Sequence, residues 1–305
     1  MADGGAEIVE QTPRGPRRAG TAALLALTAL ALLIALLTPV LGPAPDVPER
    51  RDDPGPGPVV SPSPVRHAAG VTPNAVYPDP HGTGGTRAMR VTFPDGSRAE
   101  LSYPAELNLA ALGARPYTSG TLAGGGQEAF RALTTPLYGE PEIAAGRPMV
   151  RPLTPGVTLW PGPPGSDTTG QVLLFAFGEW RLALQDDHAS LTFDQRLSWA
   201  ENLRGTLTPD GFLTLSGGGP LRLSRPGEIR DGLLVGPQLW LGGLSRRMLV
   251  LVPVPDCGRL GGARVVLDAR HAIARSDCRD GFYLAASGDE DFVRGAIGDV
   301  RIRRL

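Results

Sequence analysis

TAALLALTALALLIALLTPVL, residues 21–41, is an apolar run of 21 residues without a charged side chain. At about 1.5 Å of rise per residue, a helix of this length spans roughly 31 Å, the thickness of a bilayer's hydrocarbon core. The run therefore predicts a transmembrane helix that anchors the rest of the chain.

A cleaved signal peptide is the alternative interpretation of the same run. Signal peptides have a shorter apolar region, about 7 to 15 residues, and a cleavage site with small residues. Here the run is longer, and Pro43 and Pro45 interrupt the small residues that follow it. Cleavage after Gly42 or Ala44 would place proline at the first mature position, so we expect an uncleaved anchor.

The flanking charges predict the orientation of the chain. Arg14, Arg17 and Arg18 precede the run, whereas the arginines at 50 and 51 are accompanied by four acidic residues. The positive-inside rule places the more basic flank in the cytoplasm. Residues 1–20 are then a short cytoplasmic tail, and the C-terminal part lies outside a cell membrane that the chain crosses once. Membrane lipid is the expected partner of the helix.

Residues 42–87 have the composition of a stalk or linker. Eight prolines fall between positions 43 and 64, with Ser, Gly and Asp among them. Such a sequence favours extended polyproline II and does not bury apolar surface. Residues 88–305 form the expected extracytoplasmic domain, which is long enough for a sizeable core. Its 23 arginines balance 23 acidic residues, so no nucleic-acid partner is expected.

Short strands dominate the pattern of that domain. Residues 90–93 and 98–103 alternate apolar and polar side chains on either side of Pro-Asp-Gly, which predicts a hairpin. Residues 172–177 are continuously apolar and predict a strand buried on both faces, followed after Gly178-Glu179 by an alternating strand at 180–184. Further strands are expected at 212–215, 221–223, 233–235, 239–241, 248–254, 282–285 and, as an edge strand, 300–303.

Helices are expected at few positions. Thr192 and Gln195 form a capping box before a helix to Arg204 that stops at Gly205, and Ser287 begins a second capping box. A shorter helix is expected at 105–112, loops between 113 and 170, and a hairpin connection at 217–219. The predicted fold is a single N-terminal transmembrane helix plus a β-rich α+β extracytoplasmic domain, mainly antiparallel, because no strand–helix–strand alternation recurs.

Cys257 and Cys278 are the only cysteines, and both fall in the expected extracytoplasmic part. An even pair in an oxidising compartment indicates a structural disulfide, and the pair lacks the CxxC spacing of redox-active sites. Cys257 follows one predicted strand and Cys278 precedes another. Neighbouring strands would bring the two residues within bonding distance.

Asp186, Asp187 and His188 form the one polar cluster with catalytic character. Two carboxylates and an imidazole are able to bind a metal or share a proton, although Asp and His are also ordinary loop residues between a strand and a capping box. Position 271 adds a histidine that we read as a surface residue. No metal site and no cofactor are predicted, since the chain has only four histidines and lacks a P-loop. The GxSxG, HExxH and SxxK signatures of serine hydrolases, zincins and penicillin-binding proteins are also absent.

Two functions follow from these observations. The first is a membrane-anchored, non-enzymatic domain that binds an envelope protein or polymer. The alternative is a membrane-anchored envelope hydrolase or metal-dependent enzyme that uses Asp186, Asp187 and His188. A site for catalysis is expected to gather polar side chains in a concave pocket, whereas a binding domain is expected to show an exposed apolar or aromatic patch.

Overall fold

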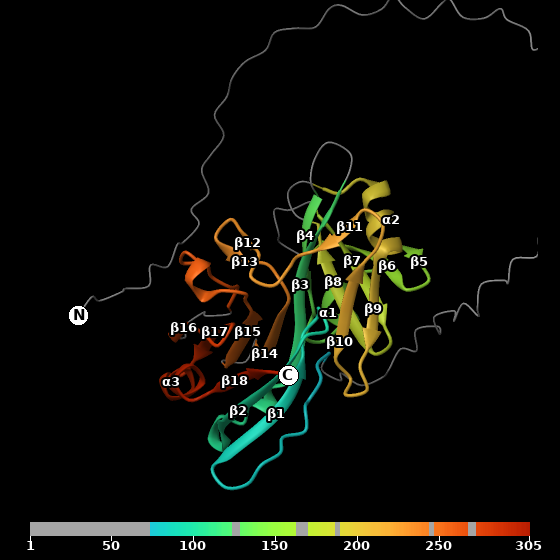
Figure 1. The fold of residues 1–305 in the computed structure, drawn as a ribbon. Coiled ribbons are helices and arrows are strands. Elements are labelled where there is room, and N and C mark those ends of the chain that lie inside the picture. The colour runs from blue at the N-terminus through green and yellow to red at the C-terminus, as the bar shows by residue number, and fades with distance from the viewer. Residues whose placement is uncertain (1–73, 124–128, 163–169, 187–189, 244–246, 268–272) are drawn as a thin grey trace, which may run out of the picture. The chain divides into compact units, whose positions relative to one another are not determined.

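A computed structural model describes residues 74–123, 129–162, 170–186, 190–243, 247–267 and 273–305 (Figure 1). The expected cytoplasmic tail, the apolar run 21–41 and most of the proline-rich stalk lie outside these residues. Within the described residues, no helix is long and apolar enough to cross a membrane. The fold is β-rich and antiparallel, as the sequence predicts.

One large antiparallel sheet runs through the described domain, in the order β16-β17-β15-β14-β3-β4-β8-β7-β6-β5, with β11 paired to β3. Its strands are β3 (Ala114–Leu122), β4 (Ala129–Thr134), β5 (Arg151–Thr154), β6 (Val157–Pro161), β7 (Gln171–Phe177), β8 (Trp180–Gln185), β11 (Leu221–Leu223), β14 (Gln238–Gly242), β15 (Met248–Pro253), β16 (Ile273–Arg279) and β17 (Phe282–Gly288).

Strand β3 joins the two halves of this sheet. Its first residues pair with β14, for example Arg115 with Trp240, and its later residues pair with β4, for example Thr118 with Leu133. Figure 1 shows the two groups of strands on either side of this long strand. Each half is covered by its own smaller elements, so the domain has two principal cores on one face of a shared sheet.

A three-stranded sheet covers the first half. It consists of β1 (Thr86–Thr92), β2 (Arg98–Pro104) and β18 (Arg301–Arg304), in the order β1-β2-β18. Met89, Leu101 and Ile302 point inward and pack with the large sheet and with helix α3 (Glu290–Gly298). The 3-10 helices η1 (Ala105–Leu107) and η2 (Leu109–Leu112) close the same core.

The second half is covered by helix α2 (Phe193–Asn202) and the hairpin of β9 (Leu203–Leu207) and β10 (Leu213–Gly217). Trp199 of α2 is fully buried among the apolar side chains of β4, β7 and β8. Two smaller clusters occupy the other face of the large sheet: one lies against the loop before β16, and one lies beneath helix α1 (Glu140–Ala144). A short separate hairpin is formed by β12 (Ile229–Arg230) and β13 (Leu233–Leu234).

Several sequence predictions are confirmed. The β1–β2 hairpin forms around the Pro-Asp-Gly turn, and β7 and β8 pair in register after Gly178. Residues 172–175 are buried on both faces, as their continuous apolar character predicts, because the two clusters lie on opposite sides of β7. Strand β18 pairs with β2 alone among the described strands, which is an edge position.

The prediction of loops between 113 and 170 is wrong. The described part of this segment contains β3, β4, α1, β5 and β6. The prolines of this segment do not prevent strand formation, because they lie where a missing N–H is tolerated. Pro152 lies in the terminal strand β5, and Pro161 is the last residue of β6.

The predicted helix ends also need correction. Helix α2 ends at Asn202, and Gly205 lies within β9 opposite Leu215 instead of stopping the helix. A Cβ at Gly205 would lie 2.6 Å from the Phe177 ring, so close strand packing explains the glycine. The N-cap of α3 is Asp289, whose carboxylate accepts from the Phe292 N–H, whereas Ser287 lies in β17. This hydrogen bond holds the pKa of Asp289 below its usual value.

Two further segments differ from expectation. Residues 105–112 form two 3-10 helices because Asn108 adopts a left-handed conformation between them, with φ of 46°. Residues 217–219 do not connect a hairpin, since β10 pairs with β9 and β11 pairs with β3. These glycines instead connect β10, which belongs to the β9–β10 pair, to β11, which belongs to the large sheet.

Segment 74–87, which the sequence analysis assigns to the stalk, packs on the domain. The Asn74 side chain donates to the carbonyls of Pro136 and Arg181, and its Oδ1 accepts from the Arg181 N–H. Val76 exchanges backbone hydrogen bonds with Ala114. The ordered contacts of the domain therefore include residues from Asn74 onward.

Candidate functional site

Asp186 lies directly after β8, on the side of the sheet that carries α2. Its carboxylate is fully buried and accepts from three sources. Arg131 donates to Oδ1 through Nε at 3.2 Å and through a terminal nitrogen at 2.8 Å, and Arg196 donates to Oδ2 at 2.8 Å. The Leu191 N–H lies 2.8 Å from both oxygens. Both carboxylate oxygens are therefore committed to partners within the fold.

These contacts join three elements that the sequence separates. Arg131 comes from β4, Asp186 follows β8, and Arg196 lies in the second turn of α2. Burying a carboxylate is costly unless charge partners and hydrogen bonds accompany it, and this network supplies both. The geometry explains Asp186 as the residue that fixes α2 over the second core. Sequence reasoning identified this aspartate as notable but not its arginine partners, which stand 55 and 10 residues away.

Asp187 and His188, the other two candidate catalytic residues, lie outside the described residues, as does His271. The catalytic hypothesis for them stays a prediction. Among the residues that the structure describes, no group of three His, Cys, Asp or Glu side chains has the arrangement of a metal site.

The predicted disulfide between Cys257 and Cys278 is confirmed. The bond joins the 3-10 helix η3 (Cys257–Arg259) to β16, with a Cα–Cα separation of 5.6 Å. This separation is typical of disulfides. Strands β15 and β17 pair directly and β16 pairs with β17, so the sheet brings the two cysteines together as the sequence analysis expects. The bond fixes the start of the loop that follows β15.

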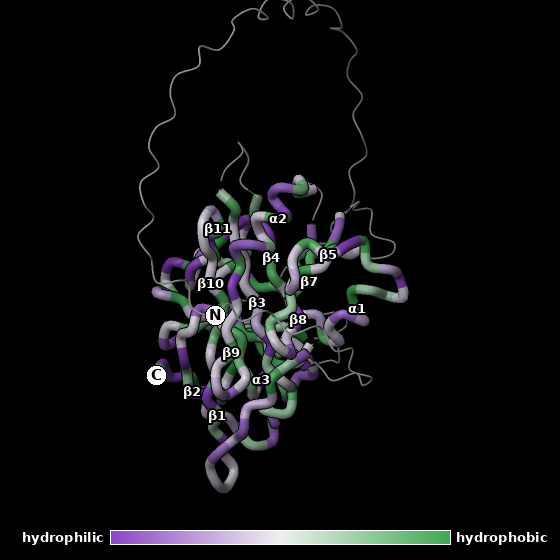
Figure 2. Tube along the Cα trace, turned by 90° about the vertical axis from the view of Figure 1, so that its right-hand side faces the viewer, coloured by the Kyte–Doolittle hydropathy of each residue, from purple (hydrophilic) through white to green (hydrophobic). Residues whose placement is uncertain are grey.

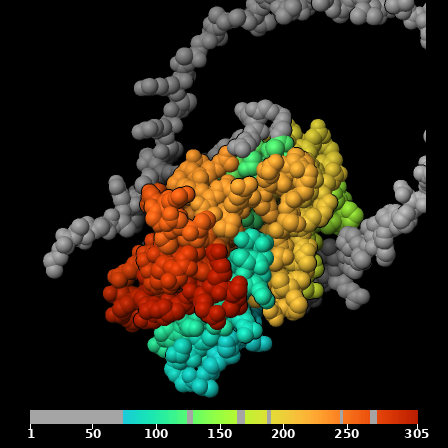
Figure 3. All heavy atoms as spheres, in the orientation of Figure 1, coloured from blue at the N-terminus to red at the C-terminus, as the bar shows by residue number. Residues whose placement is uncertain are grey.

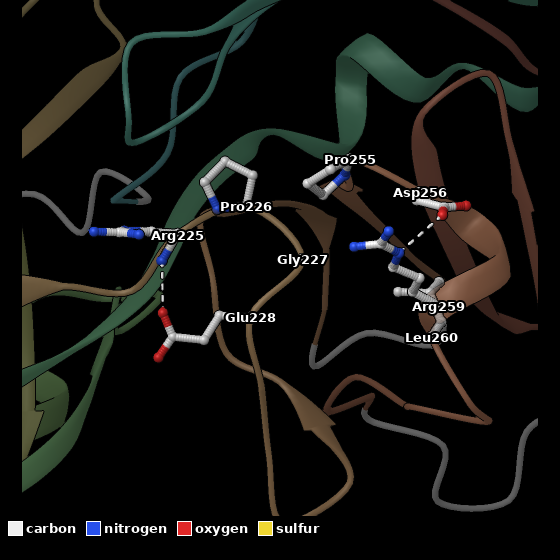
Figure 4. A pocket seen from close by; sticks show the side chains of 8 residues that line it. All are labelled: Arg225, Pro226, Gly227, Glu228, Pro255, Asp256, Arg259 and Leu260. Carbon is white, nitrogen blue, oxygen red and sulfur yellow. Dashed lines mark hydrogen bonds and ion pairs between the residues drawn. The ribbon is translucent and has the colours of Figure 1, made fainter.

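That loop forms one wall of a surface pocket of about 330 Å³ (Figure 4). Pro255, Asp256, Arg259 and Leu260 line this wall. The opposite wall is the turn between β11 and β12, with Arg225, Pro226, Gly227 and Glu228.

The two walls of the pocket meet at Gly227. A Cβ at this position would lie 2.6 Å from Pro255 Cδ, and the φ of Gly227 is +74°. Glycine is thus required both by the backbone conformation and by the close approach. The disulfide at Cys257 anchors the segment that contains Pro255, the other partner in this contact.

The acidic side chains of the pocket already have partners. Glu228 accepts from the Ser224 hydroxyl and from the Arg225 N–H, and Asp256 accepts from the Gly258 N–H and pairs with Arg259. These contacts stabilise the turns that carry them. Figure 4 shows two arginines, Arg225 and Arg259, beside the proline, glycine and leucine residues that complete the lining. The pocket is therefore a recess of mixed apolar and charged character whose acids are bonded to their own turns.

A buried arginine on the other face of the sheet was not anticipated from the sequence. Arg115 donates to the carbonyls of Thr135 at 3.0 Å and Gly242 at 2.5 Å, and burial lowers the pKa of its guanidinium. Beside it, Tyr117 stacks on Trp240 with ring centroids 4.8 Å apart. Burial raises the pKa of Tyr117 to about 12. Arg115 links β3, the segment after β4 and β14, which is a structural role at the junction of the two half-sheets.

Comparison with known proteins supplies no relative for this chain. No protein-family model, no curated protein and no solved structure matches it.

Proposed function

We propose that the chain is a single-pass membrane protein whose C-terminal domain lies outside the cell membrane and binds an envelope protein or polymer without chemical turnover. The apolar run 21–41 and the arginines before it support the anchor and its orientation. The Cys257–Cys278 bond supports an extracytoplasmic position for the domain, because disulfides persist in oxidising compartments.

The observation that carries the binding interpretation is that the Asp186 carboxylate is fully engaged by partners within the fold. Of the three candidate catalytic residues it is the one that the structure describes, and both its oxygens are bonded to Arg131, Arg196 and Leu191. A general base or metal ligand needs a lone pair directed at substrate or metal. In Asp186 the lone pairs are directed at Arg131, Arg196 and the Leu191 N–H instead. The alternative of an envelope enzyme at this position then rests on Asp187 and His188.

Complementation of a deletion strain tests binding against turnover. We expect the full chain with Asp187→Ala or His188→Ala to complement fully, because a binding domain needs neither side chain for chemistry. A chain truncated after residue 73, which keeps the anchor, is expected to fail. Protein amounts are checked by immunoblot. Loss of complementation by either single variant at normal abundance and normal melting temperature would reject the binding proposal in favour of an active site.

The anchor and its orientation have a separate test. We expect the protein extracted from membranes to retain its original N-terminus, lacking at most Met1, since the apolar run exceeds the length of a signal peptide's core. Intact-mass spectrometry measures this directly. Protease added to cells with a permeable or removed wall should degrade the domain and leave a tag on the N-terminus protected. A mature chain beginning between Thr38 and Asp53 would disprove the anchor.

A further inference from the structure

The small sheet β1-β2-β18 carries a charge imbalance that the domain as a whole does not have. Its three strands contain six arginines and a single acidic residue, Glu100. Residues 88–305 are balanced, with 23 arginines and 23 acidic residues. Positive charge is therefore concentrated on one sheet, and the rest of the domain is correspondingly acidic. Figure 3 shows the start and the end of the described chain side by side where this sheet lies.

Strand alternation places four of these arginines on the outward face. Met89, Val91, Ala99, Leu101 and Ile302 point into the core, so the residues between them point outward. We call the outward set the basic face: Arg90, Arg98, Arg301 and Arg303. The hydropathy colouring of Figure 2 shows hydrophilic residues along β2 and toward the C-terminus.

Glu100 organises the centre of the basic face. It stands between Arg90 on one neighbouring strand and Arg303 on the other, with nitrogen–oxygen distances of 3.8 and 3.0 Å. The side chains of Arg90 and Arg303 remain 73% and 70% exposed. One carboxylate, which also lies 3.9 Å from His81 Nε2, thus pairs with two guanidinium groups while leaving most of their hydrogen-bond donors open to solvent.

Protection of a sheet edge is the simpler explanation for such charges. Arginines on β18 discourage pairing with another chain, because β18 is a terminal strand of the small sheet. This explanation accounts for Arg301 and Arg303. It does not account for Arg98, which lies on the central strand β2, or for Arg90, whose strand edge is partly covered by the His81–Ala88 bridge.

We propose that the basic face binds a linear polyanion of the cell envelope whose repeating charged groups are phosphodiesters. The proposal rests on the binding function proposed above and names the class of its partner. Guanidinium groups bind phosphate oxygens through two parallel hydrogen bonds. Outward residues repeat at about 7 Å along a strand, and strands lie about 4.8 Å apart, so the face presents a regular array to a chain of phosphates.

A polymer fits this face better than a bilayer surface does. Interfacial membrane binding combines basic residues with aromatic or leucine side chains that enter the acyl region. The outward positions of β1 and β2 carry Thr86, Ala88, Arg90, Thr92, Arg98, Glu100, Ser102 and Pro104, and those of β18 carry Arg301 and Arg303. This set contains no aromatic side chain, and the one large aliphatic residue beside it is Leu305, which follows β18 and is 45% exposed.

The test uses the full-length protein in detergent and poly(glycerol phosphate) as the probe, with dextran as the neutral polymer. The test variant is Arg90→Gln/Arg98→Gln/Arg303→Gln. The control variant is Arg222→Gln/Arg264→Gln/Arg275→Gln, which makes the same charge change at three exposed arginines on other elements. Dissociation constants are measured as a function of salt concentration. Vesicles of phosphatidylglycerol and a single-stranded DNA oligonucleotide are compared at equal phosphate concentration.

We expect the test variant to bind the probe about 100-fold more weakly at about 0.1 M salt, with a salt slope lowered by about 2, since each phosphate contact contributes roughly 0.7–0.9 to the slope. The control variant should stay within about threefold of the unaltered protein, as expected for arginines that do not contact the probe. Equal losses in both variants, no preference for the probe over dextran, or tighter binding to the vesicles or the DNA would overturn the proposal. If probe binding fails in any of these ways while the anchor-only chain still fails to complement, the binding function stands and only the polyanion assignment falls.

Discussion

Asp186→Ala is expected to lower the free energy of unfolding by about 3–5 kcal/mol, the range found when one partner of a buried ion pair is removed. The substitution leaves Arg131 and Arg196 without their shared carboxylate and removes the acceptor of the Leu191 N–H. The side chains of both arginines are largely buried, 9% and 15% exposed, so water does not replace the lost partner fully. Urea denaturation followed by tryptophan fluorescence measures the change.

Two companion variants make this expectation specific. Asp210→Ala removes an exposed carboxylate from a turn and should alter stability by less than about 0.5 kcal/mol, the usual size of a surface substitution. Asp186→Asn keeps one acceptor oxygen but not the charge, so the stability of this variant should lie between the stabilities of Asp186→Ala and Asp210→Ala. A loss for Asp186→Ala no larger than that for Asp210→Ala would mean that the ion pairs do not hold α2 to the sheet. Full stability combined with lost complementation would instead make Asp186 a functional residue.

The strands that the sequence predicts are those whose local pattern is self-sufficient. The β1–β2 hairpin has alternation and a Pro-Asp-Gly turn within fourteen consecutive residues, and β7 is apolar throughout, so neither depends on distant information. Helix α2 is recognisable because its capping box forms from Thr192 and Gln195 alone. Each of these signals lies inside the element that it specifies.

The elements that the sequence does not predict are specified by distant partners. The sequence predicts loop where strand β3 forms, because β3 pairs with β14 and β11, which lie about a hundred residues or more later in the chain. Its Arg115 and Ser119 are polar at buried positions, and their hydrogen bonds end on carbonyls of Gly242 and Val235. Alternation is lost when both faces of a strand are covered, so local periodicity cannot reveal such a strand.

The features of the candidate site divide in the same way into those with a local signal and those that depend on distant partners. The disulfide follows from two cysteines and the compartment, without knowledge of the fold. The partners of Asp186, the pocket between Gly227 and Pro255, and the basic face each require strands that are remote in sequence to be placed side by side. Arginine is frequent in this chain, and only the pairing of β1, β2 and β18 shows where it accumulates.

Loss of the disulfide is the second large expected effect. Cys257→Ser/Cys278→Ser should lower the free energy of unfolding by about 3 kcal/mol, because the bond closes a loop of 21 residues in the unfolded chain. Urea denaturation is measured with and without reductant. Reductant should destabilise the unaltered protein to the level of the double variant and should leave the double variant unchanged. Alkylation of the native protein without reductant should label neither cysteine.

The double variant also tests how the disulfide relates to the pocket and to the compartment. Cys257 lies between Asp256 and Arg259, so the wall that approaches Gly227 should become accessible to protease when the bond is absent, whereas the basic face on β1, β2 and β18 should keep its binding properties. Equal stability of the unaltered protein with and without reductant would show that the bond does not form in the purified chain. That result would also remove the support that the disulfide gives to an extracytoplasmic domain, since a reduced pair is the normal state of cysteines in the cytosol.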